Sequence, residues 1–342
     1  MNSENEQGTQ DTGSSQNSQN SQNSQNSQNS QNSQNGQNGQ SRQSIVLGDV
    51  EVTRVIEWQG PFGPPRSLVP EVGAEVWKEN EEWLSPDHWE VDGDRAVLAL
   101  QTWVLRSAGK TVLVDTGVGN GRERPGSALF HHREGDFLGE LERAAGIRPE
   151  DVDIVVNTHV HGDHVGWNTF AQDGGWVPAF PNAQYLIPAA DDHHFGPANA
   201  YGGGAREVDR LIYEDSIAPV HRTGQVVLWD GAHRIDEHLT LETAPGHTPG
   251  SSVLRLASGT DRAVFVGDLL HSPVQILEPA CNSCFCLDAA QAAASRRRIL
   301  ERAADQSELL VPAHFGGTGA VEVRRQGQDF ALGAWASHRD VG

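Results

Sequence analysis

A cluster of metal-binding residue types at positions 157–166, directly after the apolar run Ile154–Val156, constrains this chain more than any other feature. The cluster reads Asn-Thr-His-Val-His-Gly-Asp-His-Val-Gly, so three imidazoles and one carboxylate fall within six positions. The apolar run is typical of a strand, and His159 and His161, two residues apart in extended chain, would project to the same side. Groups this close would strain one another unless a cation coordinated them, which predicts a metal site.

The next part of the cluster is expected to complete that site, because Gly162 would let the backbone fold so that Asp163 and His164 face the same space. Three later segments repeat the order of strand and then ligand. The runs 239–243, 263–266 and 309–311 are followed by His247, Asp268 and His314. Each of these is weak evidence by itself, since a glycine beside a His or Asp more often marks a turn than a ligand.

Strand-like and helix-like patterns alternate from residue 45 to residue 342, which predicts an α/β fold with one large core or two fused layers. The clearest helices are expected at 288–304, with Asp288 as the N-cap, and at 136–145. Strands are expected at 50–57, 96–105, 111–114, 154–157, 184–187, 226–229, 239–243, 253–256, 263–266 and 309–311.

Residues 14–40 repeat Ser-Gln-Asn with a period of three and contain no apolar side chain. Such a segment buries too little surface to offset chain entropy, so residues 1–44 are predicted to be a disordered tail. An inert tail from repeat expansion is the simpler interpretation, and self-association through Gln and Asn is the alternative. The folded domain is then expected at 45–342.

The charge balance limits the classes of partner that the chain can bind. The sequence has 46 acidic and 25 basic residues, and the net charge is −21. Nucleic-acid binding depends on cationic side chains, so nucleic acid is not expected as a main partner. No apolar run is long enough for a membrane span, and no secretory segment opens the chain. The three cysteines all lie within residues 281–286 and cannot link distant parts of a secreted fold. We therefore expect a cytoplasmic protein, and a homodimer as the assembly to test.

The cluster and the three later segments, in this order, resemble the metallo-β-lactamase superfamily over about residues 97–315. The resemblance implies a four-layer αββα sandwich, two divalent metal ions, and Asp115 as a residue that supports the metal loop from behind. Nitrogen and oxygen ligands suit zinc, with manganese, iron and cobalt as alternatives. Carried over residue by residue, it places His159, His161 and His247 on the first ion, Asp163, His164 and His314 on the second, and Asp268 between both.

The implied activity is hydrolysis of ester-like bonds in small neutral molecules, namely lactones, carboxylic esters or phosphotriesters, by a metal-bridging hydroxide. Asp163 or Asp268 is expected to pass a proton to the leaving group. His271 stands where lactonases of this superfamily carry a tyrosine. It either assists the reaction as a proton donor or is an ordinary buried histidine. The alternative activity is that of a mononuclear iron oxidoreductase similar to the persulfide dioxygenases, in which Asp163 and His164 bind no metal.

The region after Asp268 most resembles the branch that holds methyl parathion hydrolase and lactonase-like enzymes, whose pocket is lined by aromatic residues. Candidates for that lining, with the core as the ordinary alternative, are Trp167, Phe170, Trp176 and Phe285. Free thiols near the site are expected from Cys281, Cys284 and Cys286, with a redox-active Cys281/Cys284 pair as the alternative. Asp191 or Asp192 is expected to cap a helix, with His193 and His194 exposed.

Overall fold

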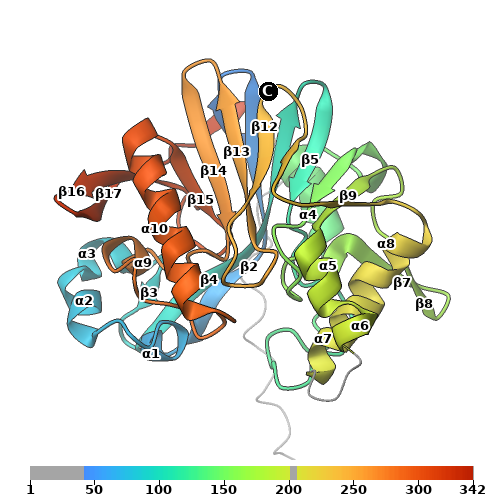
Figure 1. Ribbon diagram of the computed structural model, residues 1–342, viewed down its shortest axis with the longest axis horizontal. Coiled ribbons are helices and arrows are strands. Elements are labelled where there is room, and N and C mark those ends of the chain that lie inside the picture. The colour runs from blue at the N-terminus through green and yellow to red at the C-terminus, as the bar shows by residue number, and fades with distance from the viewer. Residues whose placement is uncertain (1–41, 201–205, 342) are drawn as a thin grey trace, which may run out of the picture. The chain divides into compact units, whose positions relative to one another are not determined.

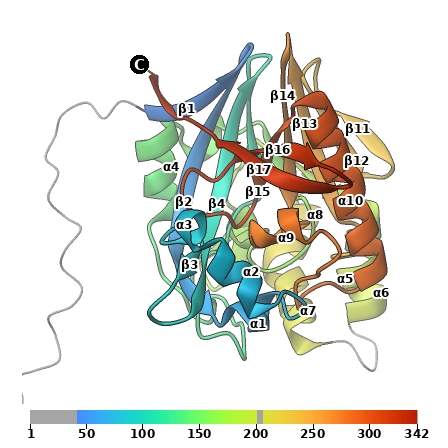
Figure 2. The ribbon, with the colours of Figure 1, turned by 90° about the vertical axis from the view of Figure 1, so that its left-hand side faces the viewer.

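Two β-sheets pack face to face at the centre of the protein, and helices cover the outer face of each sheet (Figure 1, Figure 2). The computed structural model describes residues 42–200 and 206–341. This arrangement confirms the predicted four-layer αββα sandwich. The predicted tail lies outside the described residues except at its end, where residues 42–44 already belong to the first strand rather than preceding the domain.

The first sheet is mixed, with parallel pairing between β5 and β6 and between β6 and β9. All six strands predicted between residues 50 and 229 belong to it. Its order is β10 (Val226–Trp229), β9 (Gln184–Pro188), β6 (Ile154–Val156), β5 (Lys110–Val114), β4 (Arg95–Ser107), β2 (Val50–Gly63), β1 (Arg42–Leu47) and β18 (Arg339–Val341), with β3 (Trp89–Glu90) beside β4.

The second sheet contains the remaining four predicted strands, and only β14 and β15 pair in parallel within it. Its order is β11 (Ala232–Arg234), β12 (Leu239–Thr243), β13 (Ser252–Ser258), β14 (Asp261–Gly267), β15 (Leu309–Pro312), β16 (Val321–Gln326) and β17 (Asp329–Trp335). A separate hairpin joins β7 (Thr169–Gln172) to β8 (Gly175–Pro178).

The two predicted helices are present as α4 and α10, and the side chain of Asp288 caps α10 by accepting a hydrogen bond from the backbone of Gln291 at 2.9 Å. The α-helices are α1 (Pro65–Leu68), α2 (Ala74–Glu79), α3 (Glu81–Leu84), α4 (Phe137–Ala145), α5 (Ala189–Phe195), α6 (Pro197–Ala200), α7 (Glu207–Ile212), α8 (Ala218–Arg222), α9 (Val274–Leu277) and α10 (Ala289–Gln306). Short helical turns of other types are η1 (Pro149–Asp151), η2 (Gly166–Asn168) and η3 (Tyr213–Ile217). Within the described residues, every helix is too short or too polar to cross a bilayer.

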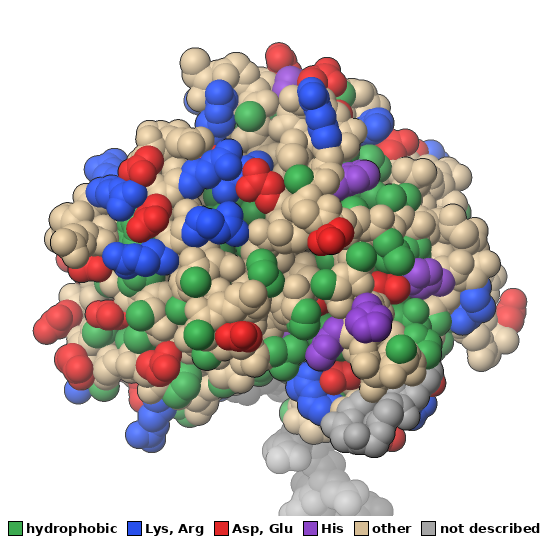
Figure 3. Space-filling model, in the orientation of Figure 1, with side chains coloured by type: hydrophobic (Ala, Val, Ile, Leu, Met, Phe, Trp, Pro, Cys, Tyr) green, Lys and Arg blue, Asp and Glu red, His purple; other side chains and the backbone are tan. Residues whose placement is uncertain are grey.

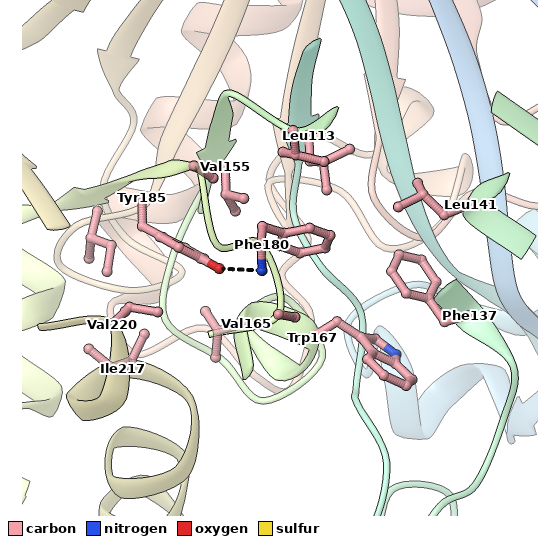
Figure 4. Packing of buried hydrophobic residues seen from close by; sticks show 14 of the residues in the cluster. Leu113, Phe137, Leu141, Val155, Val165, Trp167, Phe180, Tyr185, Ile217 and Val220 are labelled. Carbon is pink, nitrogen blue, oxygen red and sulfur yellow. Dashed lines mark hydrogen bonds between the residues drawn. The ribbon is translucent and has the colours of Figure 1, made fainter. Parts of the chain in front are cut away.

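The central strands are buried on both faces, which explains their continuous apolar sequences. In β5, Val112 and Val114 face the second sheet, whereas Leu113 faces the helical layer. On that side Leu113 belongs to one cluster with Phe137 and Leu141 of α4, as Figure 4 shows. Burial of a side chain of this size contributes about 2 kcal/mol, so the core holds the strand ends firmly in place.

Basic side chains gather on the face of the molecule around α10 (Figure 3). Arg297 and Arg302 of α10 lie beside carboxylates, whereas Arg298 donates to the carbonyl oxygen of Thr243. Arg302 lies 3.5 Å from Glu242 and 3.2 Å from Glu308, and Arg297 lies 3.6 Å from Glu301. The charge of Arg297 and Arg302 is thereby balanced within the fold.

Candidate metal centre

The predicted metal-binding residues meet at one edge of the sandwich because each follows the carboxyl end of a strand. His159 follows β6, and β6 is parallel to β5, so the loops after these two strands leave at the same edge. Asp268 and His314 follow β14 and β15, which are also parallel. His247 follows β12 of the second sheet. Residues separated by 155 positions (159 to 314) therefore come together.

One group of side chains surrounds the Oδ2 atom of Asp268. This oxygen lies 3.2 Å from Nε2 of His247 and 3.6 Å from Nε2 of His159. His161 completes the group, since its Nδ1 atom lies 3.1 Å from Nε2 of His159 and 3.0 Å from Nε2 of His247. These four side chains each direct one ligand atom to a common point.

A second group faces the other oxygen of the same carboxylate. Oδ1 of Asp268 lies 3.1 Å from Nε2 of His164 and 2.9 Å from Nε2 of His314. Asp163 adjoins both imidazoles, with carboxylate oxygens 3.8 Å from His164 and 3.6 Å from His314. Asp268 therefore stands between two groups of three side chains, and all seven predicted residues lie together.

Two divalent cations fit this arrangement. Nε2 of His164 and Oδ1 of Asp268 are buried atoms without a hydrogen-bond partner among the described residues, although they face each other. Buried polar atoms normally have partners, and a cation between them would provide one. The donor set contains imidazole nitrogens and carboxylate oxygens only, which suits zinc and similar ions.

Three of these groups have pKa values that favour the forms that bind metal, and three do not. Burial lowers the pKa of His159 and His161 well below the ordinary value, so both imidazoles are neutral. Burial alone would raise the pKa of the Asp268 carboxyl, but the facing imidazoles of His164 and His314 hold it well below its usual range. The carboxylate between the two groups is therefore ionised. Burial lowers the pKa of His164, His247 and His314, but the nearby carboxylate of Asp268 outweighs it and raises the pKa, to about 9 for His247.

The outward-facing nitrogens of the histidines are held by other parts of the chain, as is usual for metal ligands. Nδ1 of His314 lies 2.8 Å from the carbonyl oxygen of Ala99, and Nδ1 of His159 lies 3.1 Å from Oγ1 of Thr158. Asp115, at the end of β5, holds His164 in the same way. These contacts orient each ring toward the common centre.

Asp191 has a different role from the helix cap that the sequence predicted. The cap position of α5 is Pro188, and Asp191 lies inside the helix, fully buried. Its carboxylate accepts hydrogen bonds from the backbone N–H of Val160 at 2.9 Å, from Oγ1 of Thr248 at 2.8 Å and from the backbone N–H of Gly250 at 2.5 Å. One side chain thus joins the loop of His159 to the loop of His247. His193 and His194 are exposed, as expected.

Gly162 also differs from the prediction, because its φ is not positive and the turn does not require glycine's conformational freedom. A Cβ atom there would make close contacts with side chains, 3.2 Å from Nε of Arg124 and 3.3 Å from Cδ1 of Ile212. Gly246, before His247, does need to be glycine. Its φ is 131°, and a Cβ atom would lie 2.1 Å from the backbone nitrogen of Ala292.

His271 lies against the centre rather than in the distant core. Its Nε2 atom is 3.1 Å from Oδ2 of Asp268, and its backbone N–H donates to Oε1 of Gln275 at 2.7 Å. Nδ1 is buried and has no hydrogen-bond partner in the described part of the chain. Burial lowers the pKa of His271 to about 4 despite the opposing charge of Asp268, so the ring is neutral near pH 7.

A cavity of about 610 Å³ opens above the centre, and Asp163, Asp268 and His271 line it. Of the four aromatic residues predicted as lining, only Phe285 lies there. Trp167 stacks on Phe137 in the core, Phe170 packs against the same core, and Trp176 lies under the guanidinium of Arg122. The aromatic wall comes instead from residues that the sequence analysis did not single out, namely Trp58, Phe62 and Phe130.

The chain is similar to known proteins in both sequence family and fold. The family model described as the metallo-beta-lactamase superfamily matches residues 97–314. Among solved structures, the dizinc quorum-quenching lactonase AidC is 22% identical, with a TM-score of 0.71 over 87% of this chain and 99% of that one. The hydrolase AbOPH is 20% identical, with a TM-score of 0.68 over 84% and 95% of the two chains. A probable metal-dependent hydrolase from Staphylococcus aureus is 17% identical, with a TM-score of 0.68 over 84% and 98%.

Proposed function

The chain belongs to the metallo-β-lactamase superfamily and is a metallo-hydrolase, and we propose that it uses two divalent ions, zinc first among them, to hydrolyse ester-like bonds in small neutral molecules. Lactones are the first substrates to test, followed by carboxylic esters and phosphotriesters. The observation that carries the proposal is the position of Asp268, whose two oxygens face two separate groups of ligand atoms.

In this proposal the ligands of the first ion are His159, His161 and His247, those of the second are Asp163, His164 and His314, and Asp268 is shared. When bound, such ions supply Lewis acidity and a hydroxide nucleophile at neutral pH. The chain itself then needs no serine or cysteine nucleophile at the centre. Its own task is to hold the substrate and to move one proton.

Proton transfer falls to side chains that line the cavity. Asp163 is the least buried of the acidic residues at the centre, with 17% of its side chain exposed, so it can meet a leaving group. His271 is neutral and donates Nε2–H toward Asp268. That contact lets His271 steady the Asp268 carboxylate, while Asp163 or Asp268 passes the proton to the leaving group.

The cavity favours uncharged, partly apolar substrates. One wall contains the side chains of Trp58, Leu98 and Leu100, and the rings of Phe62 and Phe285 meet edge to face with centroids 6.2 Å apart. An acyl or aryl group would bury apolar surface there, while its ester-like bond would lie over Asp268. This supports placing the chain in the branch that holds methyl parathion hydrolase and lactonase-like enzymes.

We also propose that the enzyme works in the reducing cytoplasm on a small molecule, without nucleic acid or membrane as a partner. The support is that Cys281, Cys284 and Cys286 are all free thiols. A homodimer is the assembly to test by light scattering.

The alternative, a mononuclear iron oxidoreductase of the same fold, would leave Asp163 and His164 without metal. It is disfavoured because both lie with His314 in a group whose ligand atoms are within 4.8 Å of one another. Elemental analysis separates the two functions. Two divalent ions per chain support the hydrolase, whereas one iron with consumption of oxygen supports the oxidoreductase.

The activity test uses a lactone, an aryl ester and a phosphotriester with the purified, zinc-loaded chain. Asp268→Ala is expected to lower kcat/KM at least about 100-fold, since a catalytic metal would be lost or displaced. Asp261→Ala, at the exposed start of β14, is the matched control and should keep the wild-type rate. Near-normal turnover in a folded Asp268→Ala protein would refute the shared position of this carboxylate.

A further inference from the structure

The loop between α9 and α10 lies directly against the loop of His247. The backbone N–H of Leu287 donates to the carbonyl oxygen of His247 at 3.0 Å, and the backbone N–H of Asp288 donates to that of Gly246 at 2.8 Å. These two bonds fix the preceding residue, Cys286, beside the metal centre. The position of its thiol is therefore set by the fold of two segments.

The thiol of Cys286 is the partner of His247 on the side away from Asp268. Its Sγ atom lies 3.8 Å from Nδ1 of His247 and 3.6 Å from Oγ of Ser283. His159, His164 and His314 have oxygen atoms in the corresponding position. His247 is 1% exposed, so water cannot readily replace the sulfur as the acceptor of its Nδ1–H.

The same residue also forms part of the cavity wall. Cys286 is half-buried and lines the cavity together with Phe285 and His271. A small uncharged molecule that enters the cavity thus meets an apolar wall that contains the nucleophilic sulfur of Cys286.

We propose that Cys286 is a covalent modification site for small, uncharged α,β-unsaturated carbonyl compounds, and that its modification releases the metal ion held by His247. The proposal rests on the proposed two-metal centre. In the reaction, the sulfur forms a bond to the β-carbon of the compound and the carbon–carbon π bond breaks. The thiol proton ends on the α-carbon, so neither an oxidant nor a leaving group is needed.

Release of metal follows from the geometry of His247. The adduct adds bulk between two loops that are joined by backbone hydrogen bonds, and it removes the sulfur from its place beside Nδ1. Loss of such an outer partner lowers metal affinity by about 10–100-fold. The enzyme would therefore lose metal, and with it activity, when the compound reacts at this one residue.

The experiment uses a Cys281→Ser, Cys284→Ser chain, in which Cys286 is the only thiol because the sequence has three cysteines. The zinc-loaded protein is treated with N-ethylmaleimide beside a chromophoric chelator, and peptide mass spectrometry locates the adduct. We expect zinc to transfer to the chelator at least about tenfold faster than from untreated protein. The amount of zinc bound by the chelator should increase in step with the amount of Cys286 adduct.

The matched control is Cys286→Ser with Cys281 and Cys284 retained, which should lose zinc at the same rate with and without the reagent. Zinc retained by a chain fully modified at Cys286 would overturn the inference, as would equal reagent-induced release from the control. If the double variant does not fold, the wild-type chain is titrated and zinc release is compared with occupancy at each thiol. A chain that binds no zinc before treatment would instead refute the proposed function.

Discussion

Nδ1 of His164 lies 2.9 Å from Oδ2 of Asp115, the buried residue that directly follows β5. The same carboxylate accepts hydrogen bonds from the backbone N–H of Thr158 at 2.8 Å and from its hydroxyl at 2.9 Å. One side chain therefore fixes both the imidazole and the start of the loop that carries it. This is the support that the resemblance to the superfamily implied for Asp115.

Replacing Asp115 should weaken the metal centre without removing a ligand. In Asp115→Ala, His164 loses its orienting partner, and zinc affinity is expected to fall by about 10–100-fold. Competition with a chelator of known affinity measures this change. Asp136→Ala, which removes an exposed carboxylate bound to Arg143, is the control and should bind zinc as the wild type does. Unchanged affinity in Asp115→Ala would show that His164 is held by packing alone.

Asp191 should matter for stability even when no metal is present. Asp191→Ala leaves the donors of Val160, Thr248 and Gly250 without their acceptor, so the free energy of unfolding is expected to fall by about 2–4 kcal/mol. Urea unfolding of the metal-free protein measures it. The neighbouring Asp192→Ala is the matched control. It breaks only a partly exposed contact with His221, so a change below about 1 kcal/mol is expected.

The raised pKa of Glu57 predicts that the free energy of unfolding depends on pH. Burial raises the pKa of its carboxyl, and hydrogen bonds from Val118 and Trp167 oppose this only in part. The folded chain therefore holds this proton more tightly than the unfolded chain. The tighter binding of this proton adds to the free energy of unfolding. This addition is fully present below the unfolded pKa of Glu57, near 4.5, and is lost as the pH rises through the folded pKa.

Glu57→Gln isolates this effect, since the amide does not titrate. In metal-free protein, the unfolding free energy of the wild type minus that of Glu57→Gln should fall as the pH rises above the unfolded pKa of Glu57, near 4.5. Denaturant unfolding at several pH values above that pKa measures the difference. A difference that stays constant, or that grows with pH, would mean that the folded pKa of Glu57 is not raised.

His271 should affect turnover rather than metal content. In His271→Phe, the ring that contacts Asp268 is replaced by one without an N–H donor. We therefore expect kcat to fall while two ions per chain are retained. Because the pKa of His271 is about 4, the loss should be the same at pH 6 and pH 9. Steady-state kinetics on a lactone and an aryl ester, with elemental analysis, test this. If His271→Phe turned over both substrates at the wild-type rate, His271 would be only a packing residue.

The strands and the seven converging side chains were accessible from the sequence because each signal is local. A run such as Ile154–Val156 is apolar on both faces, and the polar residues that follow it mark the strand's end. Asp191 was misread because its position at the start of a helix is also local. Its actual partners, Thr248 and Gly250, lie about 60 residues away and leave no trace near it.

Elements at the margins of the fold were missed for a related reason. In β16 (Val321–Gln326) only two of six residues are buried. The polar residues of this strand, among them arginine and glutamine, hide the apolar–polar alternation that would identify it as a strand. Strands β1 and β18 pair the two ends of the domain, which no short window of sequence can reveal. Helices α1–α3 have four to six residues each, too few for a helical period to become visible.

The wide spacing of the metal-binding residues along the sequence has a consequence for how the protein is made. The seven converging residues span positions 159 to 314 of the sequence. A polypeptide still emerging from the ribosome thus has the early histidines but not their later counterparts. A complete pair of ion positions can arise only after His314 has left the ribosome, so the centre is assembled later than the loop that carries the early histidines.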